Sequence, residues 1–297
     1  MSSASESALA AEAEAIRSAP RLKRCLWGLR HHDRPVQFLI GRVLMASGLS
    51  PLIRIHHNGY DLRFYDSSLS LELWLHPAEK PGGAERFFRR YLRRGDVVVD
   101  VGVNIGLYTM ICAVSVGDSG KVYAIEPNPR VAGYLRGNIT LNRSRNVQVH
   151  NVALGEREGS VRFSDQGQDD RNCVVDDDTG QEVPVVRLDS LPIRDQTIAL
   201  LKIDVEGYEK FVLDGATGVL PGVQCVFIET WEEHFSRYGY PCVDVHQRLL
   251  AHGFRLFRFR DEALCEVEPG YVSLKCEDLV GVRDVHDFTA RTGYPLP

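Results

Sequence analysis

The sequence predicts an α/β protein built on a doubly wound, mostly parallel sheet. Short β-branched runs alternate with helix-length segments along residues 97–229, and the first run is followed by a turn that contains two glycines. The second run ends in an acidic residue. Short apolar runs of this kind are typical of strands that are buried on both faces of a parallel sheet. At 297 residues, the chain is long enough for one large domain with additions or for two small domains.

The first predicted strand, helix and strand span residues 97–101, 106–116 and 121–125. They form one βαβ unit, and the same alternation continues with a helix at 131–142 and a third strand at 147–152. Ala153 and Leu154 are expected to close that strand.

The turn after the first strand contains Asp100, Gly102, Asn104 and Gly106, and the second strand ends at Glu126. Glycines let the backbone approach a ligand, and the helix that follows presents free N–H groups. An acid about 20 residues past such a turn is well placed to accept both hydroxyls of an adenosine ribose. The unit is therefore expected to bind a nucleoside, with the adenine near Asn151, Val152 and Ala153. Gly102→Val is expected to abolish binding while the fold persists.

The spacing of the glycines in this turn indicates which kind of nucleoside-containing cofactor it is expected to bind. A dinucleotide fingerprint needs G-x-G-x-x-G, whereas Asp100 is followed by glycines two and six residues later. The pattern Asp-x-Gly-x-x-x-Gly with a strand-end acid looks like the S-adenosylmethionine site of class I methyltransferases. From this turn alone, an ordinary strand-to-helix turn in another doubly wound protein stays an alternative.

Residues 1–85 are interpreted as an N-terminal extension of helices and a β-hairpin. Residues 37–49 are predicted to form a helix with one face packed on the body of the protein or on a partner chain. The pair Asn58-Gly59 is the strongest short-range hairpin signal, and the flanking His56 and His57 are expected to be exposed rather than metal ligands. A helix at 85–94 then leads to the central strand.

Acidic residues end two later strands. The fourth strand is predicted at 200–205, a helix at 208–220 and the fifth strand at 223–229. The two strand ends carry Asp204, Glu206 and Glu229. Because open parallel sheets bind ligands at the carboxyl ends of their strands, these acids are expected to belong to a site. Between the third and fourth strands, residues 160–188 are interpreted as a β-hairpin insertion whose acidic loop is solvated.

Composition and charge argue against several classes of partner and of metal or disulfide site. The formal charge of −5 argues against nucleic acid as a partner, and the longest apolar patch near the N-terminus is interrupted and too short to span a bilayer. Seven cysteines without a C-x-x-C pair predict neither a zinc site nor a disulfide framework. A reducing cytoplasm is the expected compartment, with no membrane partner.

Six blocks in order resemble the FkbM family of S-adenosylmethionine-dependent methyltransferases and cover about residues 86–230. They are DVGVNIG at 100–106, VYAIEPNP at 122–129, NVALGEREGSV at 151–161, VRLDSL at 186–191, KIDVEGYE at 202–209 and FIET at 227–230. The family commonly has Ala at the position of Val103. The resemblance implies a class I methyltransferase domain at 86–297, in which a helix at 243–253 and strands at 255–260 and 270–276 complete the sheet with an antiparallel last strand.

The resemblance also implies the cofactor S-adenosylmethionine and O-methylation of a hydroxyl on a secondary metabolite, a sugar or another small molecule. The residues expected to bind the cofactor are Asp100, Gly102, Asn104, Gly106, Glu126, Pro127, Asn128, Asn151, Ala153 and Asp204. The extension is expected to cap the site or to form a homodimer.

Transfer of a sulfonium methyl group requires in-line alignment of the acceptor and removal of one proton. The candidates for this role are Asp204, Glu206, Glu229 and His234. A metal-free mechanism is favoured over a divalent cation because no known ligand spacing is present. A non-catalytic nucleoside-binding module, or methylation of a nitrogen or carboxylate, stays an alternative. The spacing of the glycines disfavours a dehydrogenase, and the absence of an Asn/Asp-Pro-Pro-aromatic motif disfavours a nucleic-acid amino-methyltransferase.

Overall fold

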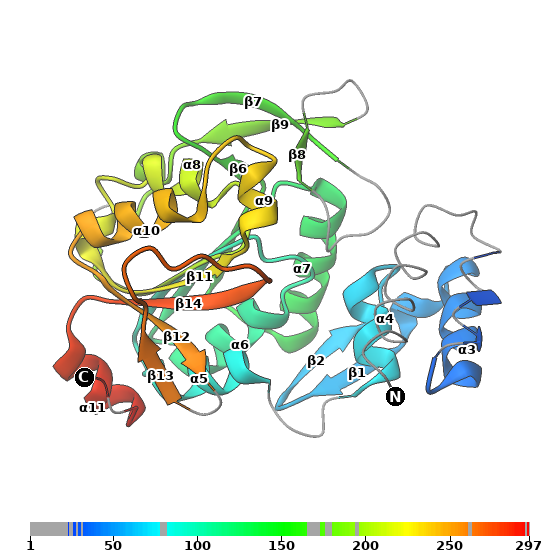
Figure 1. The fold of residues 1–297 in the computed structure, drawn as a ribbon. Helices are drawn as coiled ribbons and strands as arrows, with labels where there is room; N and C mark the ends of the chain where they lie inside the picture. The colour runs from blue at the N-terminus through cyan, green and yellow to red at the C-terminus, as the bar shows by residue number, and fades with distance from the viewer. Residues whose placement is uncertain are drawn as a thin grey trace, which may run out of the picture. The chain divides into compact units, whose positions relative to one another are not determined.

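The chain divides into two compact units in the computed structural model, which is drawn in Figure 1. The first unit comprises residues 1–56 and 63–77, and the second comprises 57–62 and 78–297. The residues described are 23, 26, 27, 29, 30, 32–77, 82–164, 173–175, 180–193, 196–260, 263–294 and 296. The division lies near the predicted boundary at residue 85, although residues 57–62 group with the larger unit. Most of the predicted acidic loop lies outside the described residues.

The first unit contains two helices that pack against each other, α3 (Pro35–Ala46) and α4 (Ser68–Leu75). Gly41 makes the close approach feasible, because a Cβ atom there would lie 3.0 Å from side-chain atoms of both Leu71 and Trp74. The Trp74 indole N–H also donates to the carbonyl of Gln37 at 3.0 Å. The predicted helix at 37–49 is confirmed, and it ends earlier than expected, before the turn at Ser47 and Gly48.

The predicted hairpin is present as β1 (Arg54–His57) and β2 (Tyr60–Arg63), with a short 3₁₀ helix at Ser50–Leu52 before it. Asn58 and Gly59 both have positive φ, 46° and 99°, as a two-residue hairpin turn of the favoured type requires. His56 is exposed as expected, but the expectation for His57 is wrong. His57 is buried because its Nε2 lies 3.0 Å from the buried carboxylate of Glu85.

The second unit is organised around an eight-stranded sheet with the order β13-β12-β14-β11-β10-β3-β4-β5. Its strands are β3 (Val97–Val101), β4 (Lys121–Ile125), β5 (Val147–His150), β10 (Ile198–Ile203), β11 (Val223–Thr230), β12 (Arg255–Arg260), β13 (Ala263–Glu266) and β14 (Glu277–Val282). The strands from β11 to β5 are parallel, whereas β14 runs antiparallel to both of its neighbours. The predicted fold class, a class I methyltransferase sheet with an antiparallel last strand, is confirmed.

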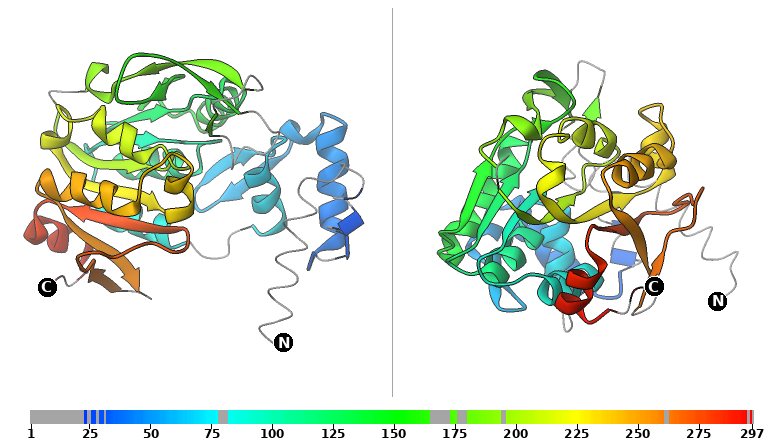
Figure 2. Two further views of the ribbon diagram at one scale, coloured as in Figure 1. Left: turned by 45° about the horizontal axis from the view of Figure 1, so that its top comes forward. Right: turned by 90° about the vertical axis from the view of Figure 1, so that its left-hand side faces the viewer.

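Helices cover both faces of this sheet (Figure 2). One face carries α5 (Gly83–Tyr91), α6 (Leu107–Val116) and α7 (Pro129–Asn142), and the other carries α8 (Glu209–Asp214) and α10 (Cys242–Ala251). The short helices α9 (Glu232–Ser236) and α11 (Val285–Thr292) complete the unit. A large core cluster lies between the sheet and the α8/α10 layer, where Val101, Leu201 and Val226 meet Val212 and Leu249.

A second, four-stranded sheet has the order β6-β9-β7-β8 and confirms the predicted hairpin insertion. Its strands are β6 (Ala153–Leu154), β7 (Gly159–Phe163), β8 (Val174–Val175) and β9 (Gln181–Val186). The prediction that the third strand continues through Leu154 is wrong, because Ala153 and Leu154 pair with β9. The chain turns away after His150, where the Asn151 amide donates to the carbonyls of Glu126 and Pro127 at 2.7 and 2.9 Å.

Three further elements differ from the prediction. Residues 270–276 do not form a strand, because Ser273 instead bonds the start of α9 through its carbonyl and Thr230 through its hydroxyl. The helix predicted at 85–94 ends at Tyr91. The helix expected after Gly207 is short, since α8 ends at Asp214 and the next residue, Gly215, lies against the Gly155 backbone. Among the described residues, no helix is both long and apolar enough to cross a membrane.

Candidate active site

Asp100 is completely buried near the end of β3. The turn that begins there, residues 100–106, is the predicted cofactor turn. One carboxylate oxygen accepts a hydrogen bond from the hydroxyl of Thr109 on α6 at 2.7 Å. The other lies 3.5 Å from the ammonium nitrogen of Lys202 on the neighbouring strand β10. Burial raises the pKa of Asp100, and Lys202 opposes that rise. Asp100 is therefore part of the support beneath the turn.

Lys202 is one of the residues of this region that the sequence prediction missed. Its side chain is only 2% exposed, and its ammonium donates to the carbonyl of Gly102 at 3.3 Å and to the carboxylate of Asp204 at 3.2 Å. Burial alone would lower the pKa of Lys202, but the carboxylates of Asp204 and Asp100 outweigh burial and raise it. A lysine inside an otherwise apolar strand is the signal that could have identified it, because a buried charge needs a partner.

Gly102 brings the cofactor turn against the end of β10. Its φ of +77° is unfavourable for other residues, and a Cβ atom would lie 1.7 Å from the carbonyl oxygen of Asp204. The close neighbour is backbone and cannot move aside as a side chain could. This geometry corrects the expectation that the fold would tolerate Gly102→Val, because the substitution would force two strands of the central sheet apart.

Glu126 links the turn after β3 to the turn after β4. One of its carboxylate oxygens accepts from the Asn104 N–H at 3.0 Å and the other from the Asn128 N–H at 2.9 Å. Asn128 in turn caps α7 by accepting from the N–H groups of Arg130 and Val131. A carboxylate oxygen can accept more than one hydrogen bond, so this placement is compatible with the predicted contact to ribose hydroxyls.

Glu126→Ala is expected to weaken binding of S-adenosylhomocysteine roughly ten- to a hundredfold, because hydrogen bonds to a charged acceptor are worth about 1.5 to 3 kcal/mol. Isothermal titration calorimetry measures the change. Glu158→Ala, which removes an exposed acid, is the control. Unchanged affinity in Glu126→Ala would exclude Glu126 from the nucleoside site.

The carboxyl ends of β10 and β11 bring three predicted residues together. His234 Nδ1 lies 3.4 Å from a carboxylate oxygen of Glu206 and 3.8 Å from one of Glu229. Glu206 has a φ of 56°, which is uncommon for a residue with a side chain. The carboxylate of Asp204, the fourth candidate, accepts a hydrogen bond from Lys202.

The protonation of this region is set mainly by burial. Burial, followed by the charge of Asp204, raises the pKa of Glu229 to about 7 and that of Asp278 to about 7. Burial lowers the pKa of His234 to about 4. The sequence prediction missed Asp278 and Cys276. Asp278 lies opposite Glu229 in the sheet, and the Cys276 thiol donates to Glu229 at 2.9 Å.

Glu209 is a buried acid behind the site, at the start of α8. One of its oxygens accepts from the Val205 N–H at 2.9 Å, and the other has no hydrogen-bond partner in the described part of the chain. Burial raises the pKa of Glu209 from 4.5 to about 8.

Because of the Glu209 carboxyl, the folded chain is expected to become less stable as pH rises. Below pH 4.5 it is protonated in both folded and unfolded chains, whereas between 4.5 and about 8 only the folded chain keeps the proton. The free energy of unfolding should therefore fall across this window, by up to about 1.4 kcal/mol per pH unit. Glu209→Gln should flatten the decline in urea titrations. A slope equal to that of the wild type would contradict protonation of Glu209 in the folded chain.

A comparison with known proteins identifies the family. The profile described as the methyltransferase FkbM domain matches residues 100–256, which is more than half of the chain. The chain belongs to the FkbM methyltransferase family. This confirms the resemblance found in the sequence, and S-adenosylmethionine is the cofactor of this methyltransferase.

Two curated relatives are similar to the methyltransferase. A protein-L-isoaspartate O-methyltransferase from Methanothrix thermoacetophila is 36% identical over 28% of this chain and 38% of its own length. The hexuronic acid methyltransferase AglP from Haloferax volcanii is 27% identical over 61% of this chain and 74% of its own length. The first match thus spans about two fifths of that relative. A solved SAM-dependent O-methyltransferase from Thermotoga maritima is 14% identical with a TM-score of 0.40, over 69% of this chain and 67% of that chain.

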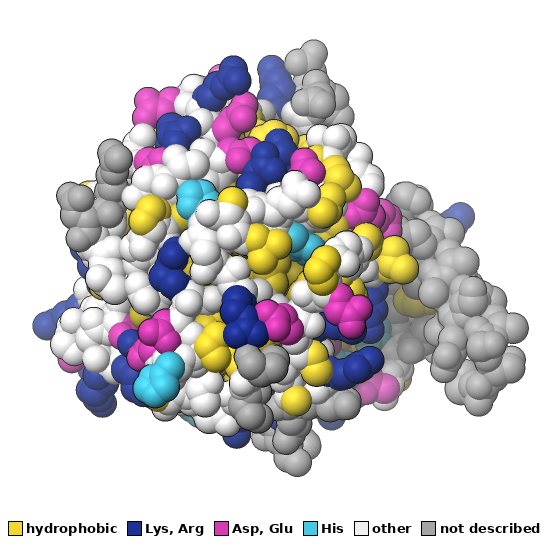
Figure 3. All heavy atoms as spheres, turned by 60° about the vertical axis from the view of Figure 1, so that its left-hand side comes forward, with side chains coloured by type: hydrophobic (Ala, Val, Ile, Leu, Met, Phe, Trp, Pro, Cys, Tyr) yellow, Lys and Arg dark blue, Asp and Glu magenta, His cyan; other side chains and the backbone are white. Residues whose placement is uncertain are grey.

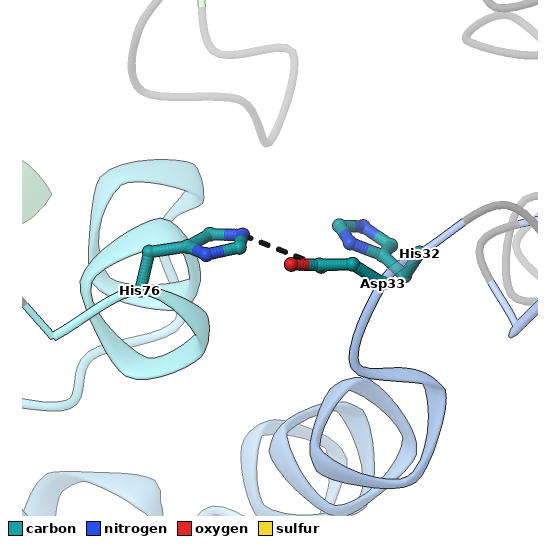
Figure 4. Close-up of side chains that lie close together, drawn as sticks. All are labelled: His32, Asp33 and His76. Carbon is teal, nitrogen blue, oxygen red and sulfur yellow. Dashed lines mark ion pairs between the residues drawn. The ribbon is translucent and has the colours of Figure 1, made fainter.

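A second group of polar side chains lies in the first unit of the methyltransferase. Figure 4 shows His32, Asp33 and His76 close together, with His76 Nε2 3.6 Å from a carboxylate oxygen of Asp33. Asp33 and His76 are exposed and His32 is half-buried, stacked on Phe38. The exposed setting is that of an ordinary surface ion pair, which contributes little to stability.

Proposed function

We propose that the methyltransferase transfers the methyl group of S-adenosylmethionine to a hydroxyl oxygen of a small, hydroxylated acceptor. The observation that carries the proposal is the position of Glu206, Glu229 and His234 at the edge of the sheet where the cofactor turn also lies. β3, β10 and β11 are parallel neighbours, so their carboxyl ends share that edge. A hydroxyl acceptor loses its proton during transfer, and a carboxylate or imidazole beside it can take that proton.

The chain's contribution to this reaction is alignment and proton removal. The acceptor oxygen attacks the methyl carbon, the carbon–sulfur bond breaks, and its electron pair stays on sulfur as a neutral thioether. The hydroxyl proton passes to the group formed by Glu206, Glu229 and His234. Because the sulfonium methyl is already activated, holding the two reactants in line supplies the larger part of the acceleration.

A sugar or sugar acid is the acceptor class that this proposal favours. AglP, the relative that aligns over most of its own length, is a hexuronic acid methyltransferase by name. On the face drawn in Figure 3, basic and acidic side chains are interspersed, and the chain carries a formal charge of −5. Neither feature suits binding to a nucleic-acid backbone, which needs a basic surface.

The proposed role of the N-terminal extension is to cap the acceptor site or to form a homodimer. The helix α3 buries Phe38 and Met45 but leaves Val36, Ile40 and Val43 exposed, with 71%, 47% and 59% of their surfaces accessible. Apolar side chains spaced at three to four residues form one stripe on a helix, which supports contact with another surface. Light scattering of the wild type and of Val43→Glu tests the dimer.

Mass spectrometry with S-adenosylmethionine and a panel of sugars, sugar acids and polyols tests the proposed reaction. The expected product carries one added methyl group on a hydroxyl oxygen, located by fragmentation. A methyl group found only on a carboxylate or a nitrogen would overturn the proposed acceptor atom. Tight binding of S-adenosylhomocysteine without turnover of any acceptor would instead favour the nucleoside-binding module.

A further inference from the structure

Three side chains from three separate elements converge on one point in the second unit. Glu206 lies in the loop after β10, Glu229 near the end of β11, and His234 in α9. One ligand atom from each lies within 4.8 Å of the other two, and His234 Nδ1 is 3.4 and 3.8 Å from the two carboxylates. Ligand atoms about 2.1 Å from one ion are roughly 3 to 4.2 Å apart, so small side-chain adjustments would let all three bind one cation.

The His234 ring supplies an independent indication of a ligand. The residue is 8% exposed, and its Nδ1 atom is buried without a hydrogen-bond partner among the described residues. The ring is held in place by Trp231, whose centroid lies 4.3 Å away. A buried polar atom that lacks a partner is costly, and here it points at two carboxylates. A neutral imidazole nitrogen in this setting is suited to ligate a metal ion.

The surrounding charges also favour a cation. Asp278 lies opposite Glu229 in the sheet, Asp204 directly follows the neighbouring strand β10, and Glu206 lies against the same imidazole as Glu229, so several carboxylates gather at this point. Two basic groups lie nearby among the described residues. Lys202 already contacts Asp100 and Asp204, and Arg237 pairs with Glu233 on α9. A divalent cation would offset the repulsion between the carboxylates.

We infer that Glu206, Glu229 and His234 form a binding site for a divalent transition-metal ion, with Mn²⁺ as the best match. Imidazole suits zinc, iron and copper, whereas carboxylates suit magnesium, calcium and manganese. A set of two carboxylates and one imidazole lies between these groups, where Mn²⁺ accepts both ligand types. The sequence favoured a metal-free site because the three ligands come from separate elements, and their spacing along the chain therefore resembles no known motif.

The role of the ion rests on the proposed function. The cation would bind the acceptor hydroxyl and a neighbouring acceptor oxygen directly, and would lower the pKa of that hydroxyl. The proton would pass to the carboxylate oxygen of Glu206 or Glu229 that does not bind the cation. Such a site selects acceptors with oxygens on adjacent carbons, as sugars and sugar acids have. A methyl acceptor with a single isolated hydroxyl would be bound less well.

Titration of the full-length chain with Mn²⁺, in the presence of S-adenosylhomocysteine, tests the site. Calorimetry and the loss of the free Mn²⁺ signal in electron paramagnetic resonance report binding without any turnover. The wild type is expected to bind one Mn²⁺ per chain. Glu206→Gln and His234→Phe, which keep the size of the side chain or the ring, should each weaken binding at least about tenfold. Glu233→Gln, on the exposed side of α9, is the matched control and should bind as the wild type does.

The outcomes separate this inference from the proposed function. A wild type that binds S-adenosylhomocysteine but not Mn²⁺, or variants that bind Mn²⁺ as the wild type does, would overturn the cation site and leave methyl transfer untouched. Binding of Mn²⁺ without any binding of the nucleoside would support the cation site and contradict the proposed reaction. Variants that fail to fold would show no heat with S-adenosylhomocysteine, and the wild-type titration then decides alone.

Discussion

Glu229→Gln is expected to lower turnover by about a hundredfold or more while the affinity for S-adenosylhomocysteine stays within a few-fold. Glu229 is positioned at the end of β11, where one oxygen accepts from the Cys276 thiol and the other faces His234. Glutamine keeps the shape and a hydrogen-bond acceptor for Cys276, but it can neither take a proton nor neutralise a cation. Positioned proton acceptors contribute about 10² to 10⁴ in rate, so the loss should appear in kcat.

Single-turnover assays of Glu229→Gln and of Glu233→Gln make the comparison. Glu233 is exposed on α9, so the control removes the same charge nearby without touching the site. Equal rates for Glu229→Gln and the wild type would remove Glu229 from the acceptor side. Asp204→Asn is a less clear test of the same role, because Asp204 is bound to Lys202 and the substitution also disturbs the cofactor turn.

Lys202→Met is expected to lower the free energy of unfolding by about 3 to 5 kcal/mol, since it leaves the buried carboxylate of Asp100 without its partner. Asp100 is fully buried, and the ammonium of Lys202 is 3.5 Å from one of its oxygens. Methionine has a similar length and fills the space, so the effect reports the charge rather than a cavity. The affinity for the cofactor should fall as well, because Lys202 also fixes the carbonyl of Gly102.

Urea denaturation of Lys202→Met and Lys210→Met separates a buried pair from a surface pair. Lys210 pairs with Asp214 on α8 at 3.6 Å, and both side chains are partly exposed. Exposed pairs contribute about 1 kcal/mol or less, which sets the expected loss for the control. A loss of that size in Lys202→Met would mean that Asp100 is neutral in the folded chain and needs no partner.

The central sheet was predictable because its strands are buried on both faces and read as apolar runs. The runs at 97–101 and 121–125 coincide with β3 and β4. The sequence could not reveal where β5 ends, because Val152 continues its β-branched pattern while the Asn151 side chain turns the chain toward the second sheet. The segment at 270–276 has a strand-like composition, yet hydrogen bonds to α9 and Thr230 hold it in another conformation.

The sequence predicted the positions of those site residues that depend only on the order of the parallel strands. Glu206 follows β10 and Glu229 lies near the end of the adjacent parallel strand β11, so their meeting at one edge follows from the order of the strands. Asp278 could not be found, because its place opposite Glu229 depends on the antiparallel register of β14. Lys202 was hidden for a different reason. Its partners, Asp100 and Asp204, were each identified as ligand-binding residues. That Lys202 forms buried ion pairs with both of them is a property of the packed sheet.

The contact between Gly102 and the Asp204 carbonyl divides the site into positions that protein engineering can and cannot change. A library aimed at new acceptors would leave residues 102, 202 and 204 fixed, because any side chain at 102 strikes the backbone at 204, and 202 and 204 are ion-paired. Residues 206 and 229 lie outside that contact and form part of the proposed proton-accepting group. Substitutions there are therefore expected to lower methyl transfer while the cofactor turn stays intact, so they separate catalysis from cofactor binding.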